Sequence, residues 1–425
     1  MKSGSRTLKL LESGVIFAAI GFLATIIHNL FQIVLSRLFV NTPGEFGLMN
    51  STVNLIGYLG MPLAIATQAV THYVARFHFS GDDARLHGLL AGCRKFLLHI
   101  TIAGSVIAII LVKPLGDFFH LPRMALTLIV LACVLGNLWS SYITALCQGL
   151  GWFKRLALIG LLAAIARLAF GWPTAYLWPM AEWGVLASVV MVLPNLILLF
   201  WRHDFPKRTQ TSISPWTPEF VQFIIVASAY TIGANIFNTG DTLVSQKYFS
   251  EANRDAYSAA EKLAVGLVTA VGPLLTVLFI HRSSRQHHHG DELWDQLKLL
   301  GLYAFGLVCG GLCLYVLRGF CLKLFHRSTP EAMAMIGRLT ISMVFVGLLQ
   351  AIGTWSLASR WTKISLLYGA LGLGYWAVLL ALGRTPAALL QIMPLATGSA
   401  FAILFVFWIV NLRHHKTAAP VEPAG

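Results

Sequence analysis

The feature that most constrains this chain is a succession of apolar runs, each about as long as a membrane-spanning helix. A spanning helix needs about 20 apolar residues, and hydrophobic side chains make up 57% of the 425 residues, against 11% charged ones. The runs fall at about 13–40, 47–77, 89–112, 123–150, 154–178, 181–201, 218–247, 254–281, 294–317, 331–358, 362–383 and 387–412. Roughly a quarter of a soluble domain is charged, so this composition excludes a soluble enzyme held by a single anchor.

The segments between these runs carry lysine and arginine unequally. Counted in alternate loops, 19 of these residues lie on one side of the membrane and 9 on the other. Because cytoplasmic loops are enriched in Lys and Arg, we expect a multi-pass protein of the cytoplasmic (inner) membrane with both termini in the cytoplasm. Attraction to anionic membrane lipids accounts for the net charge of +14. Nucleic acid is not expected as a partner, because binding it would need a basic domain and the apolar runs leave no room for one.

The second half of the chain repeats the first. Aligning the proline of the second run with that of the eighth superimposes three pairs: Pro62 and Pro273, Phe46 and Tyr257, and Asn50 and Glu261. Six helices per half keep the two copies in the same orientation, as in transporters whose halves are related by an axis along the membrane normal. We therefore predict an all-α membrane protein of about twelve helices, in which two six-helix bundles enclose a central cavity.

The repeat also suggests domain boundaries. We expect a first bundle over 1–205, a cytoplasmic linker over 206–217, a second bundle over 218–412 and a disordered tail over 413–425. The aligned helix breaks at Gly60–Pro62 and Gly272–Pro273 are of the kind that marks a transport pathway.

Polar residues inside the apolar runs indicate what the bundles enclose, because a polar group in lipid is costly unless it faces protein or water. In the seventh run Ser, Thr and Asn recur every three or four residues, which places them on one helical face. Similar faces occur in the first, second and fourth runs. The candidate cavity residues are His28, Gln32, Asn50, Asn54, Gln148, Asn235 and Asn238. Hydrogen bonding between helices is the alternative role for each of them.

Few charged side chains lie within the runs. Arg167 is in the middle of the fifth run, where it either attracts an anionic group such as a phosphate or pairs with a helix-end carbonyl, Asp241 or Glu261. Asp241 and Glu261 are candidates for binding a coupling ion, H⁺ or Na⁺, and a salt bridge to Lys262 or Arg167 is the alternative. Lys262 is a second cation that could offset the charge of a phosphate.

Motifs for ATP binding and for common enzymatic chemistry are absent from the sequence. It contains no GxxxxGK[ST] loop, HExxH motif, nucleophile elbow or glycine-rich dinucleotide loop. We expect no ATP binding, no cofactor and no enzymatic activity. The three histidines at 287–289 stand beside Arg282 and Arg285, which favours a solvated loop over a metal site. Transport would then draw on an ion gradient, the membrane potential or consumption of the product.

Several segments resemble one known superfamily. They are LSRLF (35–39), NTPGEFGLMNSTVNLIGYLG (41–60), IATQAVTHYVARF (65–77) and ALCQGLGWFKRLALIGLLAAIARLAFG (145–171). Together they resemble the polysaccharide-export branch of the multidrug, oligosaccharidyl-lipid and polysaccharide exporter superfamily. The residues that match its motifs are Arg37, Gly47, Gln148, Gly149 and Arg167, with Lys247 and Tyr257 in the second half.

The resemblance implies two six-helix bundles around a central cavity that opens alternately to each side of the membrane. It also implies a flippase that moves a lipid-linked oligosaccharide or polysaccharide repeat unit across the cytoplasmic membrane, with membrane lipids as partners. On this resemblance Arg37 joins the candidate cavity residues.

Two departures bear on the branch. The drug-exporting branch tends to carry a carboxylate in its first helices, whereas we expect no membrane-embedded Asp or Glu in the first six helices here. The lipid II flippase branch typically has two further helices. A drug or cation antiporter and a lipid II-type flippase remain alternatives within the superfamily. A membrane glycosyltransferase, ligase or polymerase is the alternative from another class. The sequence leaves the sugar, the lipid carrier, the coupling ion and the oligomeric state open.

Overall fold

The computed structural model describes residues 3–119, 121–195, 197, 218–284, 292–359 and 361–417. These residues form α-helices and one 3₁₀ turn, η1 (Phe39–Asn41), and they contain no strand. The helices are α1 (Ser3–Leu38), α2 (Glu45–Leu59), α3 (Met61–Ser80), α4 (Asp83–Phe118), α5 (Met124–Gly149), α6 (Phe153–Leu177), α7 (Ala181–Val190), α9 (Pro218–Tyr248), α10 (Glu251–Ser284), α11 (Glu292–Leu324), α12 (Pro330–Ala358), α13 (Thr362–Leu382) and α14 (Pro386–Thr417).

Local sequence explains where these helices begin and break. The side chain of Asp82 caps α4 by accepting a hydrogen bond from the backbone N–H of Arg85, at 3.1 Å, which satisfies a donor that a first helical turn leaves free. The second apolar run breaks where expected, because Gly60 separates α2 from α3 and Pro62 lies in the first turn of α3. The two helices meet at an angle of 48°. The matching break expected at Gly272–Pro273 is wrong, because α10 continues through these residues to Ser284.

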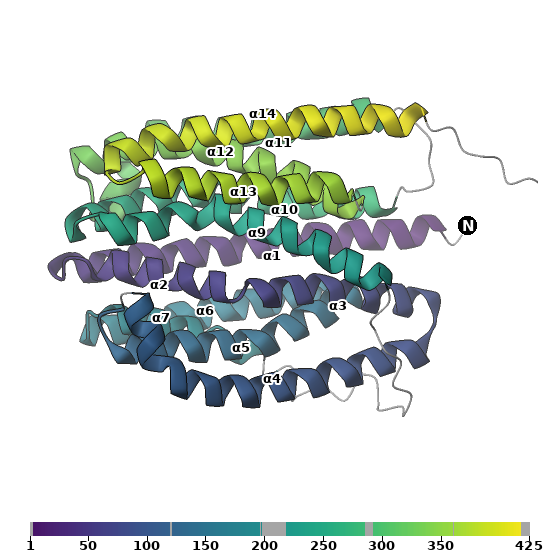
Figure 1. Cartoon of the computed structure of the whole chain (residues 1–425), viewed down its shortest axis with the longest axis horizontal. Coiled ribbons are helices and arrows are strands. Elements are labelled where there is room, and N and C mark those ends of the chain that lie inside the picture. Colours follow the sequence, from purple (N-terminus) through teal and green to yellow (C-terminus); the bar gives the residue numbers. More distant parts are fainter. Residues whose placement is uncertain are drawn as a thin grey trace, which may run out of the picture.

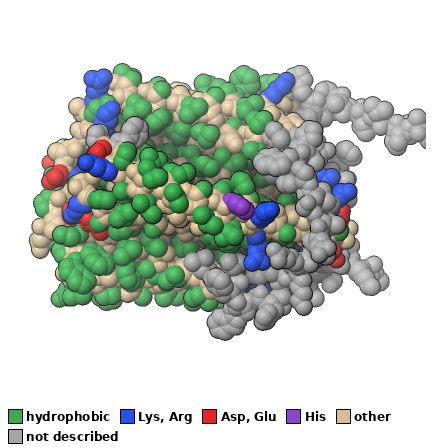
Figure 2. All heavy atoms as spheres, turned by 60° about the horizontal axis from the view of Figure 1, so that its bottom comes forward, with side chains coloured by type: hydrophobic (Ala, Val, Ile, Leu, Met, Phe, Trp, Pro, Cys, Tyr) green, Lys and Arg blue, Asp and Glu red, His purple; other side chains and the backbone are tan. Residues whose placement is uncertain are grey.

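Most of the helices have the length and composition of membrane spans. Eight are long and apolar enough to cross, and the bent pair α2–α3 makes a ninth span if it is counted as one. The helices α9 and α10 contain 31 and 34 residues but lie outside this set, and they carry Asp241 and Glu261. Hydrophobic side chains cover the middle of the face seen in Figure 2, and charged ones gather toward its ends. The prediction of an all-α, multi-pass membrane protein is confirmed.

The helices form two bundles that lie side by side, α1–α7 and α9–α14 (Figure 1). Their internal packing repeats. In the first bundle α1 packs against α6, α3 against α5, and α5 against α7; in the second, α9 packs against α13, α10 against α12, and α12 against α14. Each half is therefore built in the same way from six segments in the same order.

The predicted segment boundaries meet the structure in part. The linker expected over 206–217 lies outside the described residues. The predicted end of the second bundle at residue 412 is too early, because α14 continues to Thr417.

One end of the molecule contains the loops 39–44, 121–123, 249–250 and 325–329. We call it the distal end, because it lies opposite the N-terminus (Figure 1). Its loops are joined by hydrogen bonds such as those from Arg327 to the Phe39 carbonyl and from Arg123 to the Glu45 carboxylate. The count of basic residues places the distal end outside the cytoplasm, which stays a prediction.

Candidate functional site

The interior of the first half contains a buried cation, Arg167 of α6. Its side chain is 2% exposed, and its Nη1 lies 2.8 Å from Nδ1 of His28 on α1. The guanidinium carbon lies 4.2 Å from the centre of the Phe31 ring, a distance at which a cation is attracted to an aromatic face. Because a guanidinium only donates hydrogen bonds, the imidazole nitrogen that faces it is an acceptor.

The Arg167 charge is not neutralised by a carboxylate among the described residues. Its Nε and Nη2 have no hydrogen-bond partner there. The sequence left open a pair with Asp241 or Glu261, and the structure instead gives Arg167 a neighbouring imidazole and an aromatic ring. Two donors of a permanently charged group thus stay available to an anion.

A close approach between α1 and α6 positions the Phe31 ring beside Arg167. Gly171 lies one helical turn after Arg167, and a Cβ atom at this position would come within 2.4 Å of Cε2 of Phe31. Any larger residue would therefore displace the ring. The glycine thus allows the Phe31 ring to lie against the arginine.

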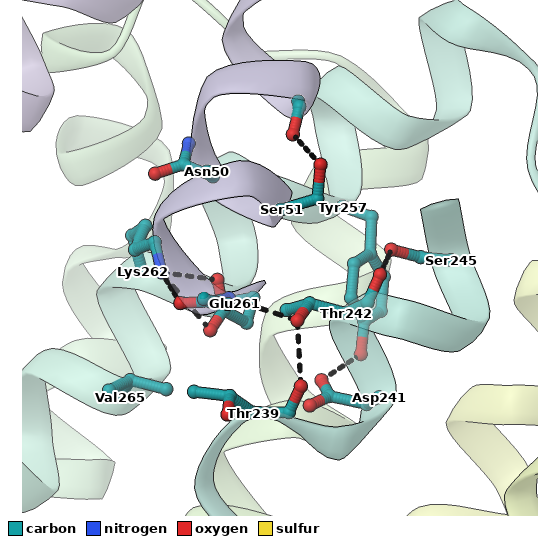
Figure 3. A network of polar contacts seen from close by, with 12 residues as sticks. Asn50, Ser51, Thr239, Asp241, Thr242, Ser245, Tyr257, Glu261, Lys262 and Val265 are labelled. Atoms are coloured by element: carbon teal, nitrogen blue, oxygen red, sulfur yellow. Dashed lines mark hydrogen bonds and ion pairs between the residues drawn. The ribbon is translucent and has the colours of Figure 1, made fainter. Parts of the chain in front are cut away.

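The interior of the second half contains two buried carboxylates, drawn in Figure 3. Asp241 of α9 and Glu261 of α10 are both 0% exposed. The hydroxyl of Tyr257 donates a hydrogen bond to Oδ2 of Asp241, and Lys262 Nζ lies 3.2 Å from Oε2 of Glu261. Two carboxylates and one ammonium leave one negative charge, which a bound proton or cation would balance.

The candidate asparagines differ in what they contact. Asn54 bridges the halves: its Nδ2 donates to Thr242 Oγ1 at 2.9 Å, and its Oδ1 lies 3.5 Å from Lys262 Nζ. The amide groups of Asn50, Asn235 and Asn238 donate to carbonyls one turn back in their own helices. Hydrogen bonding between helices, the alternative role, thus applies to Asn54.

The remaining candidates are dispersed. Gln32 is buried and its Oε1 has no partner among the described residues, whereas Gln148 accepts a hydrogen bond from Thr71 at 3.4 Å. Arg37 is exposed at the distal end, where its Nε donates to the carbonyl of Leu324 at 2.7 Å. The structure therefore does not bring Arg37 to the buried cation Arg167.

Sequence reasoning missed Phe31, which lies three residues after His28, so helical spacing would have placed it on the face of a known candidate. The repeat and the resemblance marked Tyr257, but not as a hydrogen-bond partner of Asp241. The distal residues Asp255 and Arg327 carried no sequence signal as a pair. Besides each other they contact backbone groups, which a sequence does not reveal.

The solved structures with a similar fold are transporters. An outward-facing multidrug resistance MATE family transporter of the MOP superfamily aligns with 95% of this chain and 96% of its own, at 12% identity and a TM-score of 0.69. The inward-facing conformation of such a transporter aligns with 96% and 100%, at 14% identity and 0.66. A MOP superfamily transporter from Pyrococcus furiosus, described by a binding pocket of reverse polarity that suggests a different function, aligns with 95% and 96%, at 13% and 0.62.

No protein-family model and no curated protein matches the chain. At 12–14% identity the likeness establishes the fold. The expected superfamily fold is confirmed, and the polysaccharide-export branch within it is not.

Proposed function

We propose that this protein is a flippase that moves a lipid-linked oligosaccharide, or a polysaccharide repeat unit, across the cytoplasmic membrane by alternating access. The observation that carries the proposal is Arg167, a buried guanidinium with two unpartnered donors and no carboxylate partner among the described residues. A permanent charge in a membrane helix is expensive unless it is paired or faces water, and such residues commonly mark the path of a substrate. The two phosphates of a lipid-linked sugar supply that anion.

The polar side chains of the interior suit the rest of such a substrate. A sugar headgroup cannot cross about 30 Å of hydrocarbon unaided, because its hydroxyls would lose their hydrogen bonds to water. Amide groups such as those of Asn50 and Gln32, whose oxygens are buried without a partner among the described residues, can replace that hydration. The lipid tail would stay in the bilayer during transfer.

The buried carboxylates supply a means of coupling. Lys262 pairs with Glu261, and Oδ1 of Asp241 has no hydrogen-bond partner among the described residues, so the second half would gain a favourable partner when a proton or Na⁺ binds. Binding and release of this ion on opposite sides of the membrane would drive the conformational cycle. Transport would then need neither ATP nor a cofactor.

Two observations favour a second candidate, a drug or cation antiporter. Solved structures of this fold include multidrug resistance transporters, and a buried carboxylate pair can also bind a cationic drug. The first half argues against a cationic substrate. Two of its carboxylates, Glu45 and Glu182, lie at the distal end rather than beside Arg167, and there they pair with the cation Arg123.

Reconstitution into liposomes tests the choice. The purified protein is placed in vesicles that contain a polyprenyl-pyrophosphate oligosaccharide, and exposure of the sugar to an added glycosidase is followed. We expect protein-dependent transfer that continues without ATP and that Arg167→Ala abolishes. Transfer of a cationic dye, with none of the glycolipid, would overturn the flippase and establish the antiporter.

A further inference from the structure

Helix α2 belongs to the first half by sequence, yet one of its faces is hydrogen-bonded to the second half. The face consists of Gly47, Ser51, Asn54 and Tyr58, which follow one another at spacings of four, three and four residues. We call these four residues the α2 ladder. Its contacts with the second half are Gly47 N–H to Asp255 Oδ1 at 2.8 Å, Ser51 Oγ to Gln246 Oε1 at 2.8 Å, Asn54 Nδ2 to Thr242 Oγ1 at 2.9 Å, and Thr239 Oγ1 to the Tyr58 hydroxyl at 3.2 Å.

The outermost contact of the ladder is expected to be the strongest, because its acceptor is a carboxylate and the hydrogen bond is charge-assisted. Asp255 is 1% exposed, and its two oxygens accept hydrogen bonds from the backbone N–H groups of Gly44 and Gly47 at the start of α2. These N–H groups have no partner within their own helix, and the amino end of a helix attracts negative charge. Charge-assisted hydrogen bonds are roughly twice as strong as neutral ones.

Arg327 secures this contact from the second half. Its Nη2 lies 3.2 Å from Asp255 Oδ2 and 3.0 Å from the carbonyl of Phe39. One guanidinium thus holds the carboxylate of its own half and a backbone oxygen of the other. The next backbone carbonyls toward α11, those of Leu324 and Phe325, accept hydrogen bonds from Arg37 and Ser36.

At the end of the ladder away from the distal side, the helix bends and the contact with the second half changes from polar to apolar. Helix α2 ends at Gly60, and α3 continues at an angle of 48°. Beyond this break the contact with α9 is apolar, since Ile65 of α3 packs in a cluster with Val226 and Ala227. Apolar contacts are non-directional and tolerate a change of angle, whereas the hydrogen bonds of the ladder do not.

We propose that the α2 ladder is the gate that closes the distal side, that Asp255 is its latch, and that Gly60 is the hinge at which α2 turns away from the second half. The proposal rests on the proposed function, since a transporter has to open this side. The ladder also reaches the buried charges: Lys262 Nζ lies 3.5 Å from Asn54 and 3.2 Å from Glu261. Neutralising Glu261 would therefore weaken the ion pair that holds Lys262 beside Asn54 of the ladder.

A distance measurement tests the gate without any substrate. Spin labels are attached to cysteines at Asp117 and Arg384, which are exposed and lie at the distal ends of α4 and of the α13–α14 loop, in a chain whose six native cysteines are replaced. We expect Asp255→Asn to increase the population at longer distances at least threefold. An unchanged distance distribution would overturn the latch.

Two alanine variants of α2 supply a matched pair. A Cβ atom at Gly47 would lie 2.6 Å from Cγ of Arg254 and 3.1 Å from Oδ1 of Asp255, whereas a Cβ atom at Gly57 has nothing within 4 Å. Gly47→Ala should therefore shift the distances as Asp255→Asn does, and Gly57→Ala should leave them unchanged. Equal behaviour of the two variants would contradict the gate, because their effects on the helix itself are the same.

Cross-linking tests whether the gate has to open. Cysteines at Ser51 and Gln246 are joined by a short thiol reagent that reduction removes, and transfer of the glycolipid is measured before and after reduction. The control pair, Ser140 and Asn195, are hydrogen-bonded at 2.6 Å within the first half. We expect at least a tenfold loss for the first pair, reversed by reduction, and little change for the control.

Transport by the cross-linked first pair at the rate of the control would overturn the gate. If the parent protein moves no glycolipid at all, the proposed function fails, and the distance measurement still decides on the gate.

Discussion

The two halves pack their helices in the same way and bury opposite charges. The first half encloses Arg167, which contacts His28 and Phe31 and has no carboxylate beside it among the described residues. The second half encloses Asp241, which accepts a hydrogen bond from Tyr257, and Glu261, which pairs with Lys262. The packing order of the helices is common to both halves, although α2 and α3 meet at a break where α10 is continuous. The difference in buried charge lies in the side chains. In the proposed function, one repeat would receive an anion and the other a proton or cation.

The same contrast appears at the distal end. Arg123 precedes α5, and it holds Glu45 and Glu182, which both belong to the first half. Arg327 precedes α12, the equivalent helix of the second half, and it holds Asp255, which also accepts hydrogen bonds from α2. Of these two equivalent arginines, Arg123 therefore braces its own bundle, whereas Arg327 joins the two bundles. An ion pair within a bundle moves with that bundle, whereas one between bundles resists their separation.

The largest effect should come from breaking the ion pair between Glu261 and Lys262 in the second half. Glu261→Gln leaves the Lys262 ammonium buried without its carboxylate, and breaking a buried pair in this way costs about 3–5 kcal/mol. We expect the free energy of unfolding in detergent to fall by this amount. Adding Lys262→Met to Glu261→Gln should restore most of the stability. A single variant as stable as the parent would show that the pair does not hold the two residues together.

Removing the cation of the first half should affect transport rather than stability. Arg167→Ala loses two or more charge-assisted hydrogen bonds to a phosphate, at about 1.5 kcal/mol each, which corresponds to roughly a 100-fold loss of glycolipid transfer. Because no described carboxylate depends on Arg167, the free energy of unfolding should fall by no more than about 1 kcal/mol.

Two further variants sharpen this prediction. Arg167→Lys should recover part of the transfer, since a point charge cannot make the paired contacts of a guanidinium. Addition of Asp241→Asn to Arg167→Ala should recover none. Recovery by the double variant would mean that the arginine serves the carboxylates, and the contrast between the halves would then be wrong.

Variants of the two distal arginines should distinguish an ion pair within one bundle, at Arg123, from the latch between the bundles, at Arg327. Arg123→Ala leaves Glu45 and Glu182 without their cation and should lower the free energy of unfolding by about 1 kcal/mol, with no change in the distance between labels at 117 and 384. Arg327→Ala should lengthen that distance. If both variants lengthen this distance, Arg123 is also part of the gate, and the two distal arginines do not differ in role.

The smallest effects should come from asparagines bonded within their own helix. The amides of Asn235 and Asn238 donate to carbonyls one turn back, so replacement by alanine should change the free energy of unfolding by about 0.6 kcal/mol or less. Asn54→Ala removes a contact between the halves and should lengthen the distal distance. Unfolding measurements and the labelled pair distinguish the two classes. A larger loss for Asn235→Ala than for Asn54→Ala would contradict the assignment.

Much of the fold followed from the sequence, because lipid leaves a chain few choices. A backbone in hydrocarbon has to satisfy its hydrogen bonds internally, so an apolar run of this length forms a helix. The break at Gly60 and Pro62 was visible for a related reason, since proline cannot continue a helix without losing a hydrogen bond. The buried positions of Arg167, Asp241 and Glu261 followed from their places within apolar runs.

The partners of these charges were decided by tertiary packing. Arg167 and His28 are 139 residues apart in the chain, and Asp255 lies 211 residues from Gly44, the residue that the repeat alignment places opposite it. A sequence gives the face of each helix on which a residue lies, but not how far each helix is rotated or shifted against its neighbours. That rotation decides whether a buried arginine meets a carboxylate or an imidazole, and whether an aspartate braces its own bundle or holds the other one. It is set by the close packing of many side chains at once, such as the fit of Phe31 over Gly171, rather than by any local pattern.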